Sequence, residues 1–147
     1  MIYTDLTKKA MIFSFRAHGS AVDKSGIPYV FHPHHVAESM PDEITTAVAL
    51  LHDVVEDTKY TFDDLRRAGF PEEVLAPLQL LTHKKGVPYL DYVKNLSADP
   101  VARRVKLGDL AHNSDLTRLN SVTEEDLKRI EKYKQARQIL LDAENAE

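Results

Sequence analysis

The sequence predicts an all-α protein, a bundle of about seven or eight helices, and three observations support this class. Apolar residues recur at the helical spacing of three to four positions along most of the 147-residue chain. No stretch of useful length alternates apolar and polar residues, as a half-buried strand would. Proline, glycine and helix-capping residues divide the periodic stretches into segments of helical length.

The N-terminal part predicts three helices and one long loop. Apolar residues at 6, 10, 13 and 17 form a single stripe, so a helix is expected over 5–18. The following "GSAVDKSGIPYVFHP" is rich in Gly, Ser and Pro and predicts a loop. Pro33 suits a first helical position, so a short helix is expected from there to about Ser39. Pro41 and Asp42 begin the next helix, which we expect to run to about Asp57.

Turn and capping residues mark the remaining elements. "TFDD" at 61–64 resembles a capping box and opens a short helix that ends near Gly69. Pro71 begins another helix, which ends near Leu81 before the loop "HKKGVP". Helices are then expected near 88–97 and 99–119, and "TEED" at 123–126 caps a last helix to about Glu144. The mixed charges of that last helix indicate a solvated face. No linker divides the chain, so we expect one domain over 1–147.

Composition and charge exclude several classes of protein. The net charge is −4 and Lys and Arg form no basic stripe, which disfavours nucleic-acid binding. No apolar run approaches the roughly 20 residues that a membrane span needs, and the start of the chain lacks the features of a secretory signal. We therefore expect a cytoplasmic protein that binds no membrane. Cysteine is absent, so thiolate metal sites are impossible, and the seven histidines are the candidates for metal ligands.

The stretch "ALLHDVVEDT" at 49–58 concentrates ionisable side chains. On a helical wheel, His52, Asp53, Glu56 and Asp57 occupy one face and apolar residues occupy the other. Taken alone, this pattern fits a solvated polar face as well as a metal-binding face. Three carboxylates within five residues, with no Lys or Arg among them, repel one another. A divalent cation would turn this repulsion into binding.

Two distant residues can complete a metal site with this stretch. His32 lies in "YVFHP", at a junction between loop and helix. Asp109 lies in "VKLGDLAHNSDL", where apolar residues at 101, 105, 107 and 110 indicate a buried helix, and a buried Asp is costly unless it is paired or coordinated. A set of two imidazoles and two carboxylates suits Mn²⁺ and would also accept Fe²⁺, Co²⁺ or Zn²⁺. The predicted metal ligands are His32, His52, Asp53 and Asp109.

These motifs resemble those of a known family. The order H…HD…D is the signature of the HD-domain metal-dependent phosphohydrolases. The stretches "AHGSAVDKSGIPYVFHPHHVA", "ALLHDVVEDT" and "VKLGDLAHNSDL" are similar to the hydrolase domain of the Rel/SpoT alarmone enzymes and to the stand-alone, Mesh1-type small alarmone hydrolases. The resemblance covers about residues 5–120 and leaves the charged helix near 123–144 outside. It implies an all-α HD-domain fold, dependence on Mn²⁺ and hydrolysis of the 3′-pyrophosphate from (p)ppGpp.

The resemblance also implies roles for individual residues. Glu56 and Asp57 match the catalytic pair of the family, and their place one turn beyond His52 and Asp53 suits them to orient water or move its proton. Substrate contacts are implied for Lys24 and Ser25, in "DKSG", and for Asn113. The alternatives are an exposed loop lysine at position 24 and a buried, hydrogen-bonded amide at position 113.

Two positions depart from the family pattern and leave the substrate open. Alarmone hydrolases typically carry an arginine immediately before the lysine of "KSG", where this chain has Asp23. They also tend to carry a basic residue two positions after the asparagine, where this chain has Asp115. A dNTP or the 2′-phosphate of NADPH is therefore an alternative substrate to (p)ppGpp. A catalytically silent nucleotide-binding module is a third reading, and the sequence does not define the oligomeric state.

Overall fold

A computed structural model describes residues 1–147 and confirms the all-α class. Apart from the four-residue α4, the α-helices number eight, and no strand is present. None of the helices combines the length and the hydropathy that crossing a bilayer requires. In chain order the elements are α1 (Asp5–His18), α2 (Phe31–Glu38), α3 (Glu43–Leu51), α4 (Val54–Asp57), α5 (Phe62–Arg67), α6 (Glu72–Leu81), α7 (Tyr89–Leu96), α8 (Pro100–Asn113), the 3₁₀ helix η1 (Leu116–Arg118) and α9 (Glu124–Asn145).

Side-chain caps fix the helix starts that the sequence motifs predict. Thr61 and Asp64 form a capping box at the start of α5. Thr123 and Asp126 form another at the start of α9. In each box the threonine hydroxyl accepts a backbone N–H of the first turn, and the acid accepts the N–H of the threonine. Both helices therefore begin where the sequence indicates.

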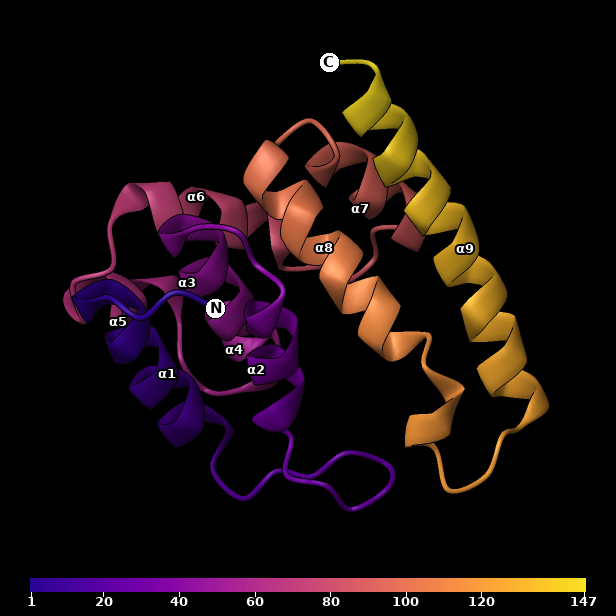
Figure 1. Cartoon of the computed structure of the whole chain (residues 1–147), viewed down its shortest axis with the longest axis horizontal. Coiled ribbons are helices and arrows are strands. Elements are labelled where there is room, and N and C mark those ends of the chain that lie inside the picture. Colours follow the sequence, from indigo (N-terminus) through magenta and orange to yellow (C-terminus); the bar gives the residue numbers. More distant parts are fainter.

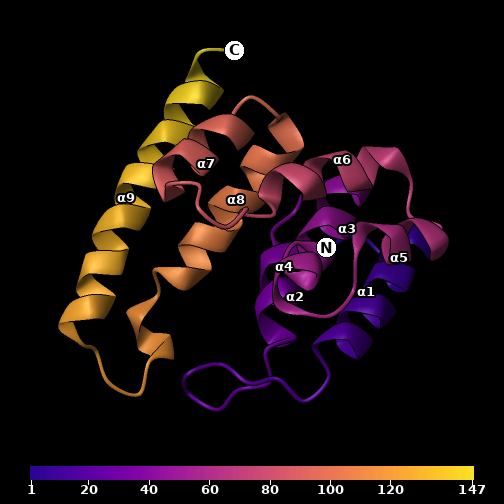
Figure 2. The same ribbon diagram turned by 180° about the vertical axis from the view of Figure 1, so that it is seen from behind.

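Helix α3 lies at the centre of the molecule. Its residues from Thr45 to Leu51 are all buried, and it packs against α1, α2, α6 and α8. Helix α9 lies at one side of the molecule, along α7 and α8 (Figures 1 and 2). The long loop 19–30 and η1 lie at the same end of the molecule (Figure 1). The core is thus centred on α3, and the two irregular segments meet at one end.

The helix expected over 42–57 is broken at His52 and Asp53, which separates α3 from α4. The imidazole Nδ1 of His52 lies 2.6 Å from the carbonyl oxygen of Ala49, the group that would accept the N–H of residue 53 in a continuous helix. A side-chain hydrogen bond thus takes the place of a helical one. Periodicity did not indicate this break because the apolar pattern continues across it.

Two other helix boundaries differ from expectation. Helix α2 begins at Phe31 rather than at Pro33, which occupies the third helical position. The first four N–H groups of a helix have no intrahelical partner, so a proline is tolerated there as well. Helix α8 ends at Asn113, and η1 follows it instead of a continuous helix to 119.

Helices α2 and α8 approach closely at Gly108. A Cβ atom at this position would lie 3.1 Å from side-chain atoms of both Val36 and Met40. The absence of a side chain therefore lets α8 lie close against α2. This approach brings Asp109, the next residue, within reach of His32 on α2.

Candidate metal centre and adjoining pocket

The structure brings the four predicted ligands together, although they come from three separate segments. Asp109 Oδ1 lies 2.9 Å from His32 Nε2 and 3.4 Å from His52 Nε2. Asp53 Oδ2 lies 3.2 Å from His52 Nε2 and 3.6 Å from His32 Nε2. The side chains of all four are largely or completely removed from solvent. We call these four residues the His–Asp cluster.

The second nitrogen of each imidazole has a partner outside the His–Asp cluster. His52 Nδ1 donates to the carbonyl oxygen of Ala49, which directs its Nε2 toward the carboxylates of Asp53 and Asp109. His32 Nδ1 lies 2.7 Å from Nδ1 of His112, whose ring is almost parallel to that of His32 and meets it edge to edge. Such outer contacts fix the tautomer and orientation of histidines that bind metals.

The two carboxylates are also held by neighbours. Asp109 accepts hydrogen bonds from Lys106 Nζ at 2.8 Å and from Asn113 Nδ2 at 2.9 Å. Asp53 accepts the hydroxyl of Tyr29 at 2.5 Å. Lys106 and Asn113 lie on the same helix as Asp109, three residues before it and four residues after it. The four side chains of the cluster are therefore held in place by residues around them.

Buried charge dominates the electrostatics of the cluster. Burial alone would raise the pKa of the Asp109 carboxyl, but Lys106 and the two histidines hold it well below its usual range. Burial lowers the pKa of His52, yet Asp53 and Asp109 together raise it to about 9. The negative potential of the carboxylates thus attracts a positive charge to the space between the imidazoles.

The donor set fits a divalent metal ion. Ligand atoms of His32, His52 and Asp109 all lie within 4.8 Å of one another. The Nε2 atom of His52 is buried and has no hydrogen-bond partner, which is costly for a polar atom unless another ligand satisfies it. Mixed imidazole and carboxylate donors suit divalent transition metals.

The predicted catalytic pair lies directly beside the cluster. Carboxylate oxygens of Asp53, Glu56 and Asp57 lie within 4.8 Å of one another. Glu56 Oε1 accepts the backbone N–H of His83 at 2.7 Å, which fixes its direction. Burial and the two neighbouring carboxylates raise the pKa of Asp57 to about 6. All three carboxylates line a small cavity of about 200 Å³ that also reaches Lys106 and Asp109.

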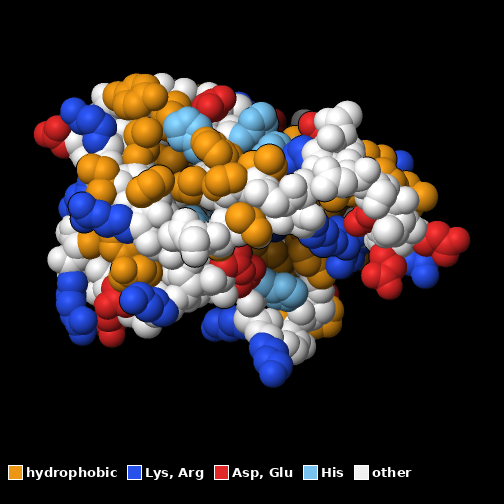
Figure 3. Space-filling model, turned by 90° about the horizontal axis from the view of Figure 1, so that it is seen from below, with side chains coloured by type: hydrophobic (Ala, Val, Ile, Leu, Met, Phe, Trp, Pro, Cys, Tyr) orange, Lys and Arg blue, Asp and Glu red, His pale blue; other side chains and the backbone are white.

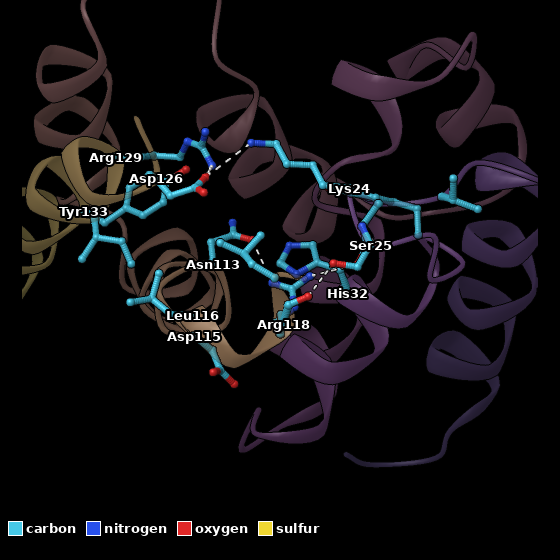
Figure 4. Close-up of a pocket in the computed structure, with 15 residues that line it drawn as sticks. Lys24, Ser25, His32, Asn113, Asp115, Leu116, Arg118, Asp126, Arg129 and Tyr133 are labelled. Carbon is cyan, nitrogen blue, oxygen red and sulfur yellow. Dashed lines mark hydrogen bonds and ion pairs between the residues drawn. The ribbon is translucent and has the colours of Figure 1, made fainter. Parts of the chain in front are cut away.

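A larger cavity of about 390 Å³, which we call the main pocket, adjoins the cluster at His32. Figure 4 shows Lys24 and Ser25 on one wall, with Lys24 reaching toward Asp126 on α9. The Lys24 and Asp126 charges lie 3.7 Å apart. Asn113 lines both the main pocket and the small cavity. The three predicted substrate contacts therefore border one continuous site.

The hydroxyl of Ser25 is already used within the protein. It donates a hydrogen bond of 2.6 Å to the backbone carbonyl of Arg118 and so joins the loop 19–30 to η1. Both residues line the main pocket. Seen from below, acidic, basic and histidine side chains gather around a hollow near the middle of the face (Figure 3).

The sequence analysis does not identify four polar residues of the main pocket: Arg118, Asp126, Arg129 and Tyr133. The last three lie on α9, where the charge pattern predicts a solvated face. The spacing of Asp126, Arg129 and Tyr133, at i, i+3 and i+7, places them on one face of the helix. An aromatic residue within that polar stripe was the available signal that the face is partly covered.

The two departures from the family pattern have local structural roles. Asp23 Oδ1 accepts the backbone N–H groups of Ser25 at 2.8 Å and Ile27 at 3.1 Å. Asp115 Oδ1 accepts the N–H and the hydroxyl of Thr117 at 3.0 and 2.6 Å, and so caps η1. Asp115 also lines the main pocket, and Figure 4 shows its carboxylate directed away from the other labelled side chains.

Known proteins resemble this chain in sequence. A GTP pyrophosphokinase rsh of Brucella ovis is 38% identical over 122 residues, which cover 74% of this chain and 16% of that protein. A GTP pyrophosphokinase of Myxococcus xanthus is 31% identical over 144 residues, which cover 86% of this chain and 19% of that protein. A Streptomyces coelicolor GTP pyrophosphokinase is 35% identical over 144 residues, 85% of this chain and 15% of its own length. The chain thus spans less than a fifth of these curated relatives.

A solved structure shares the fold over nearly the whole chain. It belongs to a metazoan orthologue of SpoT that hydrolyses ppGpp, and the two structures superpose with a TM-score of 0.71 at 24% identity. The match covers 97% of this chain and 87% of the other. No protein-family model matches the chain. In its sequence and its fold, the chain is a Rel/SpoT-like HD domain, as its motifs predict.

Proposed function

We propose that this chain is a metal-dependent phosphohydrolase that removes the 3′-pyrophosphate from (p)ppGpp, with residues 1–147 acting as a single hydrolase domain. The observation that carries the proposal is the continuity of three parts: the His–Asp cluster, the Glu56–Asp57 pair and a pocket lined by basic side chains. The metazoan SpoT orthologue of the same fold hydrolyses ppGpp, which supports the same substrate here.

The proposed metal ligands are the four residues of the His–Asp cluster, and the proposed metal is Mn²⁺. Two imidazoles and two carboxylates leave further coordination positions open for water and phosphate. A divalent ion held there supplies Lewis acidity, since it lowers the pKa of water and neutralises phosphate oxygens. The outer contacts from Ala49 and His112 keep both Nε2 atoms directed at this position.

Glu56 and Asp57 act on the attacking water. Their carboxylates lie at the edge of the small cavity, beside Asp53, where they can orient a water molecule and accept its proton. The water oxygen bonds to the phosphorus attached to O3′, and the bond between that phosphorus and O3′ breaks. Pyrophosphate and a nucleoside 5′-di- or triphosphate with a free 3′-hydroxyl result, and the proton passes to the leaving oxygen.

Basic residues of the main pocket hold the phosphates. Lys24 and Arg129 approach the same carboxylate, Asp126, at 3.7 and 3.2 Å, so this group carries one net positive charge. Arginine and lysine bind phosphate oxygens by charge-assisted hydrogen bonds. Asn113 stands between the main pocket and the small cavity, where its amide can contact the nucleotide.

The test is hydrolysis of ppGpp by the purified, Mn²⁺-loaded chain, with release of pyrophosphate as the readout. We expect turnover with Mn²⁺ and none after chelation by EDTA. Glu56→Ala and Asp57→Ala should each lower kcat by at least about 100-fold, the low end of general acid–base contributions. Glu73→Ala, which removes an exposed acid of α6, is the matched control and should leave kcat unchanged.

A panel of nucleotides separates the alternatives. Turnover of a dNTP or NADPH without turnover of ppGpp would replace the proposed substrate but keep the metal-dependent hydrolase. Tight binding of ppGpp in calorimetry without release of pyrophosphate or phosphate would indicate a catalytically silent nucleotide-binding module. The released group identifies the bond that is cleaved.

A further inference from the structure

Asp23 and Arg118 face each other in the main pocket, from the loop 19–30 and from η1. The Arg118 guanidinium lies 3.8 Å from Asp23 Oδ2, and both side chains are partly exposed to the pocket, at 25% and 21%. This distance is too long for a direct hydrogen bond. The two groups therefore lie next to each other, and each keeps hydrogen-bonding atoms that the other does not satisfy.

The backbone holds both side chains in place from the far side. One guanidinium nitrogen of Arg118 donates to the carbonyl of His112 at 2.9 Å and approaches the amide oxygen of Asn113 at 3.3 Å. Its other N–H groups have no hydrogen-bond partner. Asp23 uses Oδ1 for the N–H groups of Ser25 and Ile27, and its Oδ2 accepts no hydrogen bond. The pair thus presents fixed donors beside a fixed acceptor.

The net charge of the pair distinguishes it from the other basic group of the pocket. Lys24 and Arg129 share the single carboxylate of Asp126 and remain positive, which suits phosphate. Arg118 and Asp23 cancel each other, so they offer no net attraction to an anion. A neutral ring with both acceptors and donors on its edges is the part of a nucleotide that matches them.

Guanine matches the pair better than adenine does. Guanine carries O6 and N7 acceptors, to which an arginine donates in a bidentate manner, and N–H donors for a carboxylate. Adenine carries an amino donor where guanine has O6, and this donor would oppose the guanidinium.

We propose that Asp23 and Arg118 recognise the base of the substrate and select guanine over adenine. This inference rests on the proposed hydrolase function. It also explains how the chain can carry an acid at position 23, because the acid shapes its own loop and forms one half of the recognising pair.

The test compares hydrolysis of guanosine and adenosine 3′,5′-bis(diphosphate) by the Mn²⁺-loaded full chain. The wild type should prefer the guanosine compound in kcat/KM by about tenfold, within the range of one bidentate contact. Arg118→Ala should raise KM for the guanosine compound about tenfold, keep kcat within about threefold, and remove the preference. Arg104→Ala, an exposed arginine on α8, is the matched control and should change neither value.

Arg118 also contacts the C-terminal end of α8. An effect of its replacement on the structure of this helix end must therefore be distinguished from a loss of base recognition. Arg118→Gln retains an N–H donor for the His112 carbonyl, and it should lose the base preference as Arg118→Ala does. A loosened helix end would slow both substrates equally and keep the preference. The double variant Asp23→Arg/Arg118→Ala returns a guanidinium to the other wall, and its KM should recover to within about threefold of the wild type. An unchanged preference in both Arg118 variants would overturn the proposal.

Failure of the inference differs from failure of the proposed function. If the wild type hydrolyses the compounds and the Arg118 variants keep its preference for guanosine, then only the proposed role of Asp23 and Arg118 in base recognition is overturned. No turnover of either compound by the wild type overturns the proposed function. In that case, calorimetry with GDP and ADP tests the pair directly: tighter binding of GDP that Arg118→Ala abolishes supports it, and equal binding of both by the wild type overturns it.

Discussion

The imidazole rings of His32 and His112 lie almost parallel, with centroids 5.0 Å apart, an angle of 5° between their planes, and Nδ1 atoms separated by 2.7 Å. One of these two nitrogens must carry the proton. Burial, followed by the nearby Arg118 and the neighbouring histidines, lowers the pKa of His112 to about 4. At neutral pH His112 is therefore uncharged, and in the tautomer in which its Nδ1 accepts the Nδ1–H of His32, the lone pair of His32 Nε2 is directed at the position of the metal.

Replacement of His112 by alanine should weaken metal binding without unfolding the protein. Loss of an outer hydrogen bond to a ligating histidine costs about 10- to 100-fold in metal affinity. Titration of the metal-free chain with Mn²⁺ measures this change, and the melting temperature checks the fold. His34→Ala, which removes a half-exposed imidazole paired with Glu38, is the control. An unaltered Mn²⁺ affinity would show that His112 does not position His32.

The metal-free protein should lose stability as the pH rises. Burial lowers the pKa of His52, but Asp53 and Asp109 raise it further, from 6.5 to about 9. A group whose pKa is raised by folding stabilises the fold below its unfolded pKa, and this contribution disappears as the pH rises through the folded value. In EDTA we expect the free energy of unfolding to fall by up to about 3 kcal/mol between pH 6.5 and 9.

Urea unfolding at several pH values measures this loss, with His52→Asn as the comparison. The variant lacks the titrating group and should show a much flatter profile. With Mn²⁺ present, the dependence should reverse because protons compete with the metal for the imidazole. A flat profile for the metal-free wild type would contradict the prediction.

Lys106→Met should destabilise the metal-free protein strongly and the metal-loaded protein less. Lys106 and Asp109 form a buried ion pair at 2.8 Å, and removal of one partner leaves the other charge without compensation. Such a loss costs about 3–5 kcal/mol. A bound cation would replace part of the missing charge, so the difference between wild type and variant should shrink in Mn²⁺. Lys94→Met, at an exposed site on α7, should have little effect in either condition.

Asp126→Asn should tighten substrate binding. The carboxylate of Asp126 offsets the charges of Lys24 and Arg129, and the amide removes this offset while its oxygen can still accept the N–H of Thr123. We expect KM for ppGpp to fall about threefold at low salt and the difference to vanish at high salt. Thr123→Ala weakens the same helix cap without a change of charge and should leave KM unaltered. A raised KM in Asp126→Asn would contradict the prediction.

Residue patterns predict much of the fold because the signals are local. Capping boxes at Thr61 and Thr123 mark real helix starts, and the recurrence of apolar residues every three to four positions indicates most of the helices. The break at His52 and Asp53 is not predictable in this way. It depends on a local side-chain hydrogen bond from His52 to Ala49 and on the packing of α3 against α1, α2 and α8, and this packing joins distant parts of the chain.

The candidate site likewise has a part that the sequence predicts and a part that only the structure shows. Histidines and carboxylates in the H…HD…D order stand out by their chemistry, so the sequence predicts the four residues of the His–Asp cluster, and the structure places them next to one another. Arg118 and Arg129 look like ordinary surface charges until α9 and η1 are placed opposite the loop 19–30. Their place in the main pocket depends on tertiary packing, which cannot be predicted from the spacing of residues within one helix.

The main pocket is built from segments far apart in the chain, because Ser25 bonds to Arg118, 93 residues further along. During synthesis from the N-terminus, the His–Asp cluster has all its side chains once residue 109 has emerged from the ribosome. The main pocket still lacks Arg129 and Tyr133 at that moment. A nascent chain therefore has every side chain of the His–Asp cluster before it has the α9 wall of the main pocket.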